Sequence, residues 1–116
     1  MSNYHEPVEI LNEKTRNITR AINSLKEELE AVDWYNQRVE ASSDEELKAI
    51  MAHNRDEEIE HACMTLEWLR RNMDGWDEEL KTYLFTSGPI TSIEGQGQAS
   101  DAPSNSGNGL NIGKMK

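Results

Sequence analysis

The sequence lacks the features that are typical of secreted and membrane-bound proteins. Its 116 residues include one cysteine, Cys63, so no disulfide can form within the chain. No apolar run approaches the roughly 20 residues that span a bilayer. The N-terminal residues "MSNYHEPVEI" lack the basic and apolar regions of a secretory signal. These absences predict a soluble, cytosolic protein.

Basic residues are also few. The chain has 12 Lys and Arg against 22 Asp and Glu, which gives a formal net charge of −10. Residues 94–116 contain as many acidic as basic residues, so the whole excess lies on residues 1–93. A surface of this charge repels nucleic acid and anionic membranes and attracts cations. We therefore expect neither nucleic acid nor membrane as a partner.

Apolar residues recur at helical spacing along residues 1–93, which predicts an all-α domain. A first helix is expected over residues 7–38, since Pro7 suits a first helical turn. Its apolar stripe consists of Leu11, Ile18, Ile22, Leu25, Leu29 and Val32.

Ser43 and Glu46 have the spacing of a capping box, so a second helix is expected to begin there and to end near Met73. After the break at Asp74 and Gly75, the segment "WDEELKTYLF" predicts a short third helix.

Two helices of about 30 residues joined by a short connection form an antiparallel hairpin. Such a hairpin cannot cover its own apolar faces. A twofold dimer that completes a four-helix bundle is the commonest solution. The expected fold is therefore a ferritin-like two-helix hairpin with a short C-terminal helix, completed by dimerisation.

The C-terminal residues differ from the rest of the chain. Residues 94–109 include "GQGQASDAPSNSGNG", which predicts a flexible linker. Residues 110–116, "LNIGKMK", turn apolar again. A short apolar segment on a flexible tether favours binding to a partner, and a frayed terminus is the alternative.

A carboxylate and an imidazole border the apolar stripe of the second helix. Glu58 and His61 are three residues apart, so both can reach one metal ion. Glu28 flanks the stripe of the first helix. A Glu from each of two helices and a Glu-x-x-His from each of two others hold two metal ions in di-iron bundles. This chain carries half of that set, and a twofold dimer would supply the other half. The ligand types favour iron or manganese.

Chance is the alternative, because acidic residues are abundant and a Glu three residues before a His can lie on a solvated face. The other acidic and histidine candidates can equally be ordinary surface residues. They are Glu27, Glu30, His53, Glu57 and Glu60. Trp34, Tyr35, Trp68 and Cys63 are most simply core or interface residues.

Three segments carry a resemblance to a known family: "EELEAVDWYNQRVEAS", "AHNRDEEIEHACMTLEWLRRN" and "TYLFTSGPITSIE". Over nearly all of residues 5–94 the chain closely resembles the encapsulated ferritins, the ferritin-like cargo of encapsulin nanocompartments. The resemblance implies dimers with a ferroxidase site between subunits, and a ring-shaped decamer of five dimers. It also implies residence in the prokaryotic cytoplasm, inside the encapsulin lumen.

The same resemblance assigns roles to individual residues. It implies that Glu28, Glu58 and His61 are the iron ligands of a di-iron centre. It implies that Glu27 and Glu30 form an acidic pair through which metal enters. A further peripheral metal site, for which calcium is a candidate, falls on His53, Glu57 and Glu60. Trp34 and Tyr35 match aromatic residues beside the centre.

The C-terminal segment "GLNIGKMK" resembles the peptide by which such cargo docks on the inner shell wall. Met115 stands where leucine is expected, and Lys114 where serine is common.

The expected function is therefore a ferroxidase that oxidises Fe(II) and delivers Fe(III) for storage in the shell. Two alternatives stay open: a non-catalytic, metal-binding cargo or adapter protein, and a di-iron peroxidase or oxidase that acts on a substrate other than iron.

Overall fold

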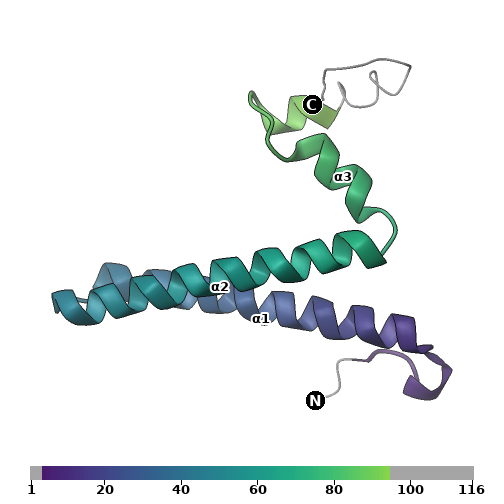
Figure 1. Ribbon diagram of the computed structural model, residues 1–116, viewed down its shortest axis with the longest axis horizontal. Coiled ribbons are helices and arrows are strands. Elements are labelled where there is room, and N and C mark those ends of the chain that lie inside the picture. Colours follow the sequence, from purple (N-terminus) through teal and green to yellow (C-terminus); the bar gives the residue numbers. More distant parts are fainter. Residues whose placement is uncertain (1–3, 95–116) are drawn as a thin grey trace. The chain divides into compact units, whose positions relative to one another are not determined.

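The computed structural model describes residues 4–94, and every regular element within that range is helical, as the sequence predicted. Figure 1 shows a 3₁₀ turn η1 (Val8–Ile10) followed by helices α1 (Glu13–Ala41), α2 (Glu45–Asn72) and α3 (Trp76–Tyr83). The chain divides into two compact units at Met73, which we describe separately. Of the predicted linker, residues 94–109, only Glu94 is described, and the terminal peptide 110–116 lies outside the described residues.

The first long helix begins later than predicted. Pro7 opens the short turn η1, not α1. Asn12 is the N-cap of α1, and its side-chain oxygen accepts a hydrogen bond from the Thr15 backbone N–H at 2.8 Å. This carboxamide satisfies one of the N–H groups left free at a helix start, so the helix begins where the cap stands. The Arg16 guanidinium donates to the Val8 carbonyl at 2.5 Å and ties η1 to α1.

The start of α2 is shifted by one residue from the prediction. Asp44, not Ser43, is the N-cap, and its carboxylate accepts from the Leu47 backbone N–H at 2.9 Å. Aspartate and serine cap helices about equally well, so the pattern alone could not choose between neighbours. The end of α2 at Asn72, with Met73 as its C-cap, confirms the predicted end.

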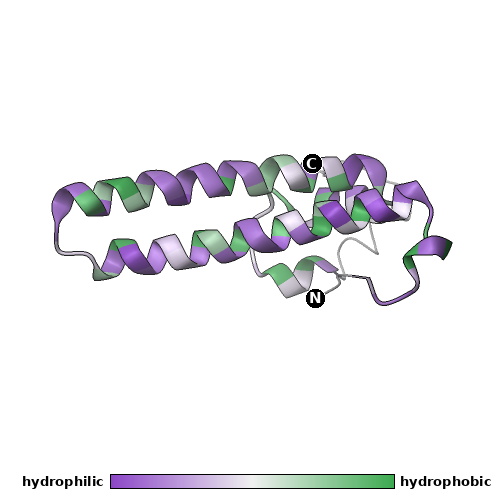
Figure 2. Ribbon diagram, turned by 90° about the horizontal axis from the view of Figure 1, so that it is seen from below, coloured by the Kyte–Doolittle hydropathy of each residue, from purple (hydrophilic) through white to green (hydrophobic). Residues whose placement is uncertain are grey.

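Helices α1 and α2 pack against each other as the predicted antiparallel hairpin (Figure 1). Two side-chain contacts fix their register. Arg55 donates to the Asn36 side-chain oxygen at 3.0 Å, and Thr65 donates to Glu28 at 3.3 Å. The residue numbers fall on one helix as they rise on the other, as an antiparallel pair requires. Figure 2 shows apolar residues distributed among polar ones along both helices.

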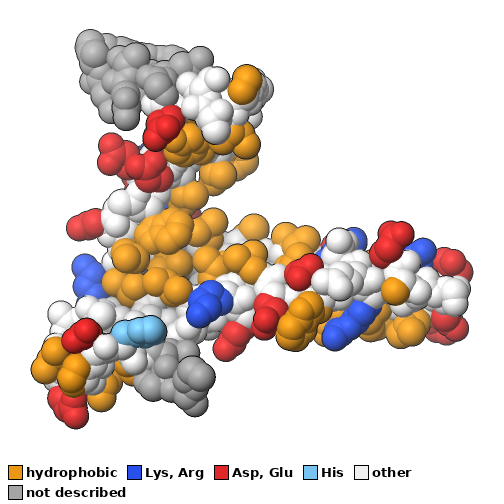
Figure 3. Space-filling model, turned by 180° about the vertical axis from the view of Figure 1, so that it is seen from behind, with side chains coloured by type: hydrophobic (Ala, Val, Ile, Leu, Met, Phe, Trp, Pro, Cys, Tyr) orange, Lys and Arg blue, Asp and Glu red, His pale blue; other side chains and the backbone are white. Residues whose placement is uncertain are grey.

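The hairpin buries very little apolar surface. In the described part of this unit, only Ala62 and Leu69 are classed as buried hydrophobic residues. Trp34 is 49% exposed and Met64 is 58% exposed. The other large apolar residues exposed on α1 and α2 are Leu29, Leu47, Ile50, Ile59 and Trp68. Figure 3 shows such side chains in patches along the hairpin, with charged ones between them. These faces need a partner to be removed from water.

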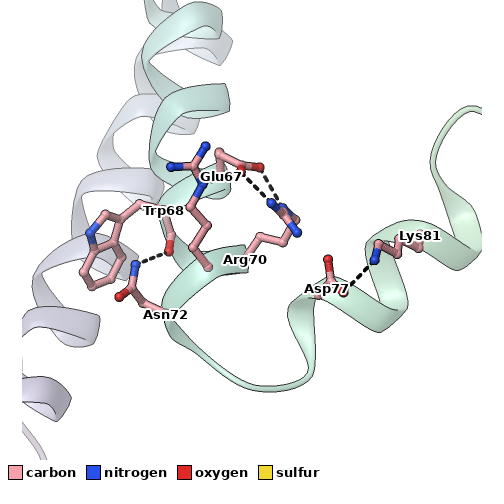
Figure 4. Close-up of polar contacts among 7 residues, drawn as sticks. Glu67, Trp68, Arg70, Asn72, Asp77 and Lys81 are labelled. Carbon is pink, nitrogen blue, oxygen red and sulfur yellow. Dashed lines mark hydrogen bonds and ion pairs between the residues drawn. The ribbon is translucent and has the colours of Figure 1, made fainter.

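The last turns of α2 carry a cluster of charged side chains (Figure 4). The Glu67 carboxylate accepts hydrogen bonds from Arg70 at 2.8 Å and from Arg71 at 2.6 Å. These bonds, with that of Arg70 the larger cause, lower the pKa of Glu67 from 4.5 to about 2. Cations near a helix C-terminus also complement its dipole.

The second unit begins at Asp74 and contains α3. Gly75, with φ of 102°, precedes the helix in a conformation that favours glycine. Asp77 and Lys81 form an ion pair at 3.1 Å, one turn apart (Figure 4). Phe85 has a φ of 63° and is fully exposed. Residues 90–94 are again helical. Within residues 4–94, no helix combines the length and apolarity that a bilayer crossing requires.

Candidate metal centre

Glu58 and His61 lie one turn apart on α2, and their side chains approach each other. A Glu58 carboxylate oxygen lies 3.5 Å from His61 Nδ1. Their side chains are 28% and 43% exposed, so both groups are at the surface of the single chain and accessible to a cation. The pair therefore has the geometry that the Glu-x-x-His spacing predicted, with an oxygen and a nitrogen donor side by side.

Glu28 on α1 is half-buried and its two carboxylate oxygens differ. Oε2 accepts the hydrogen bond from the Thr65 hydroxyl at 3.3 Å. Oε1 is buried, yet among the described residues it has no hydrogen-bond partner. A buried carboxylate oxygen without a donor is costly, and a bound cation would remove that cost. The carboxylate thus fits a metal ion on chemical grounds.

Thr65 connects the two helices that carry these candidate ligands. It lies four residues after His61 and seven after Glu58, so the three residues follow one side of α2. Because Thr65 contacts Glu28, this side of α2 faces the ligand-bearing part of α1. A surface groove at Glu28 and Thr65 is lined by these two residues and by Arg20, Ala21, Ser24, Met64 and Trp68. Thr65 was not predicted from the sequence, although its helical spacing from His61 was a usable signal.

A single chain does not assemble these donors into a complete site. Over residues 4–94 there is no group of three or more His, Cys, Asp or Glu side chains close enough to hold one metal ion. Glu58 and His61 come together, whereas Glu28 contacts the next turn of α2. One hairpin therefore offers two separate donor groups, the Glu58–His61 pair on α2 and Glu28 on α1.

The predicted peripheral ligands are dispersed on the surface. All five are exposed, and none of their side chains makes a hydrogen bond or ion pair within the part of the chain that the structure describes; they are Glu27, Glu30, His53, Glu57 and Glu60. They form no cation site in one chain, so metal entry and calcium binding at these positions stay predictions.

The aromatic residues near the ligands are partly exposed. Trp34 is exposed on α1, and Trp68 borders the groove beside Glu28. The Arg38 guanidinium lies 5.3 Å from the centre of the Tyr35 ring, a cation–π contact. Exposed tryptophans, one of them beside a groove, are typical of a surface that another chain covers.

Comparisons with known proteins agree with this fold and with the motifs. The family model described as EncFtn-like matches residues 3–87. An encapsulated ferritin-like protein of Rhodospirillum rubrum is 61% identical over 97% of this chain and 86% of its own length. A ferritin-like protein of Thermotoga maritima is 59% identical over 97% of this chain and 96% of its own length.

A more distant relative and a solved structure extend the comparison. The encapsulin nanocompartment cargo protein EncC of Myxococcus xanthus is 33% identical over 70% of this chain and 67% of its own length. A crystal structure of a Nitrosomonas europaea protein, 63% identical, superposes with a TM-score of 0.74 and covers 77% of this chain and 99% of that one. The resemblance to the encapsulated ferritins is confirmed, and this chain belongs to the EncFtn-like family.

Proposed function

We propose that this protein is a ferroxidase whose di-iron site forms between two subunits. The observation that supports it is the buried Glu28 Oε1, which has no hydrogen-bond partner among the described residues, on a helix packed against the one that carries the Glu58–His61 pair. Two hairpins related by a twofold axis would contribute two copies of each ligand. Together these ligands match the four carboxylates and two imidazoles of a di-iron bundle site.

The charges of this ligand set favour binding and release of iron. Two copies of Glu28 and Glu58 carry four negative charges, which balance two Fe(II) ions. Each Fe(II) gives up one electron, and dioxygen accepts two electrons and two protons to become hydrogen peroxide. The positive charge of two Fe(III) ions exceeds the negative charge of the four carboxylates. The Fe(III) ions are therefore bound less favourably unless hydroxide or oxide ions bind with them. His61 would act as a terminal nitrogen ligand.

The peripheral acidic residues have proposed roles around this site. Glu27 and Glu30 are exposed on α1 and would attract Fe(II) towards it. His53, Glu57 and Glu60 would form an outer cation site on α2, which a divalent ion such as calcium could occupy. The uncovered apolar patches support assembly beyond a dimer, and we propose a ring-shaped decamer of five dimers.

We further propose that the protein is cargo of an encapsulin shell. Two relatives bear names that describe them as encapsulated or as nanocompartment cargo. Residues 94–109 would act as a linker and residues 110–116 as the shell-binding peptide. Fe(III) would then be stored inside the compartment.

Shell binding can be tested by deleting residues 110–116. Leu110 and Ile112 are two residues apart, so in an extended segment they face the same way and can enter neighbouring apolar pockets. The truncated protein is expected to oxidise iron normally and to be absent from co-expressed shells. Loading equal to that of the full-length chain would contradict the targeting role.

A non-catalytic metal-binding cargo or adapter protein is the alternative function. In that case the same ligands would hold a cation that only locks the oligomer. Aerobic Fe(II) oxidation, followed by absorbance of Fe(III), separates the two. The ferroxidase predicts a rate well above that of Fe(II) in buffer, whereas an adapter predicts no acceleration.

A further inference from the structure

The hydrogen-bond acceptor of the Thr65 hydroxyl is unusual for a threonine in a helix. A threonine hydroxyl in an α-helix commonly donates to the carbonyl four residues earlier, as Thr82 does to Glu78 at 2.9 Å. The Thr65 hydroxyl instead donates across the hairpin to Glu28 Oε2. A hydroxyl has one proton, so this contact excludes the local one.

The contact makes the two oxygens of the Glu28 carboxylate different, because only one of them accepts a hydrogen bond. Oε2 is held by Thr65, and Oε1 is buried with no hydrogen-bond donor among the described residues. Both residues line the same groove. A glutamate side chain that is free to rotate loses conformational entropy when a metal ion fixes it. A hydrogen bond that already fixes it reduces that cost at the moment a metal ion binds.

We infer that Thr65 is a positioning residue for the metal ligand Glu28, and that its hydroxyl presents Oε1 to the cation. This inference rests on the proposed function, since it takes Glu28 as a ligand. Residues that orient metal ligands through a hydrogen bond typically change metal affinity or activity by about 10- to 100-fold when they are replaced. Thr65 does not touch the metal in this account, so its effect on the metal is transmitted through Glu28.

The experiment compares three replacements in the full-length protein. Thr65→Val keeps the shape of the side chain and removes the hydroxyl. Thr65→Ala also removes the hydroxyl and introduces a residue of high helix propensity. Thr65→Ser keeps the hydroxyl. Thr82→Val is the matched control, because it removes a threonine hydroxyl that bonds only within α3. Co(II) binding is measured by visible absorbance, the initial rate of Fe(II) oxidation is measured in air, and helix content is measured by circular dichroism.

The expected result is a loss of Co(II) affinity of about tenfold or more in Thr65→Val and Thr65→Ala. Thr65→Ser and Thr82→Val should retain the affinity of the unmodified protein. Affinity that is unchanged in Thr65→Ala, or that falls equally in Thr65→Ser, would overturn the inference. If Thr65→Val loses helix content, the comparison of Ala with Ser decides.

The two readouts separate this inference from the proposed function. If the unmodified protein binds Co(II) but does not accelerate iron oxidation, the ferroxidase proposal fails and the role of Thr65 is still decided by affinity. If Thr65→Ala binds Co(II) and oxidises iron as the unmodified protein does, the role of Thr65 fails and the ferroxidase proposal stands.

Discussion

Glu28 shows most clearly how one residue connects folding with chemistry. Its position on α1 follows from helical spacing, and the burial of its Oε1, which has no hydrogen-bond partner within residues 4–94, follows from packing against α2. Spacing predicted that Glu28 could face a partner. It could not predict the contact with Thr65, because that contact joins two residues 37 positions apart in sequence and depends on the register of the two helices. The peripheral residues lacked such a second observation and remain surface residues in the single chain.

Replacement of single ligands tests the site at this scale. Glu28→Ala, Glu58→Ala and His61→Ala each delete two ligands from a twofold site. Each is expected to lower the rate of Fe(II) oxidation by more than about 100-fold, the upper end of the loss seen for outer-sphere residues. Helix content should be unchanged, because all three side chains are at least partly exposed.

Glu40→Ala provides the control, since Glu40 is an exposed glutamate of α1 that has no proposed role. Its oxidation rate should equal that of the unmodified protein. A Glu58→Ala protein that oxidises iron at the unmodified rate would show that the ligand assignment is wrong.

At the scale of elements, the sequence was sufficient for the number, order and type of the long helices. It was insufficient at their starts. For α2, Asp44 caps the helix instead of the neighbouring Ser43, because the two residue types have similar capping strength. For α1, Pro7 belongs to the turn η1, and Asn12 caps the helix. The end of α2 was predicted correctly, before Gly75 with its positive φ, whereas α1 ends at Ala41 rather than at Arg38.

The cluster at the end of α2 gives a pH-dependent prediction. Glu67 has its pKa lowered to about 2 by Arg70 and Arg71. A lowered folded-state pKa means that its contribution to stability is present above the ordinary value of 4.5 and is lost as the pH falls towards 2. Glu67→Gln should therefore have a lower Tm than the unmodified protein at pH 6, and the difference should shrink below about pH 4.5.

Thermal unfolding of metal-free protein, followed by circular dichroism between pH 3 and pH 6, measures this difference. Asp77→Asn is a useful comparison, because its ion pair with Lys81 lies in α3 rather than α2. A Tm difference for Glu67→Gln that stays constant over this range would contradict the assigned cause.

At the scale of the whole molecule, the main feature is that one chain completes neither its hydrophobic core nor a metal site. The hairpin leaves large apolar residues exposed, and its donor groups do not form a metal site within residues 4–94. Both deficits would be removed by a second copy. Apposed carboxylates repel one another, and burial of unpaired charge costs several kcal/mol, until cations neutralise them. Assembly and iron binding are therefore expected to be coupled.

Sedimentation velocity of the full-length protein, in chelator and with Fe(II) under anaerobic conditions, tests this coupling most directly. We expect smaller species in chelator and a shift to larger assemblies as Fe(II) is added. Glu58→Ala, which lacks a ligand, should not respond to Fe(II). Identical, fully assembled distributions in chelator and in Fe(II) would contradict the claim that iron binding between subunits drives assembly.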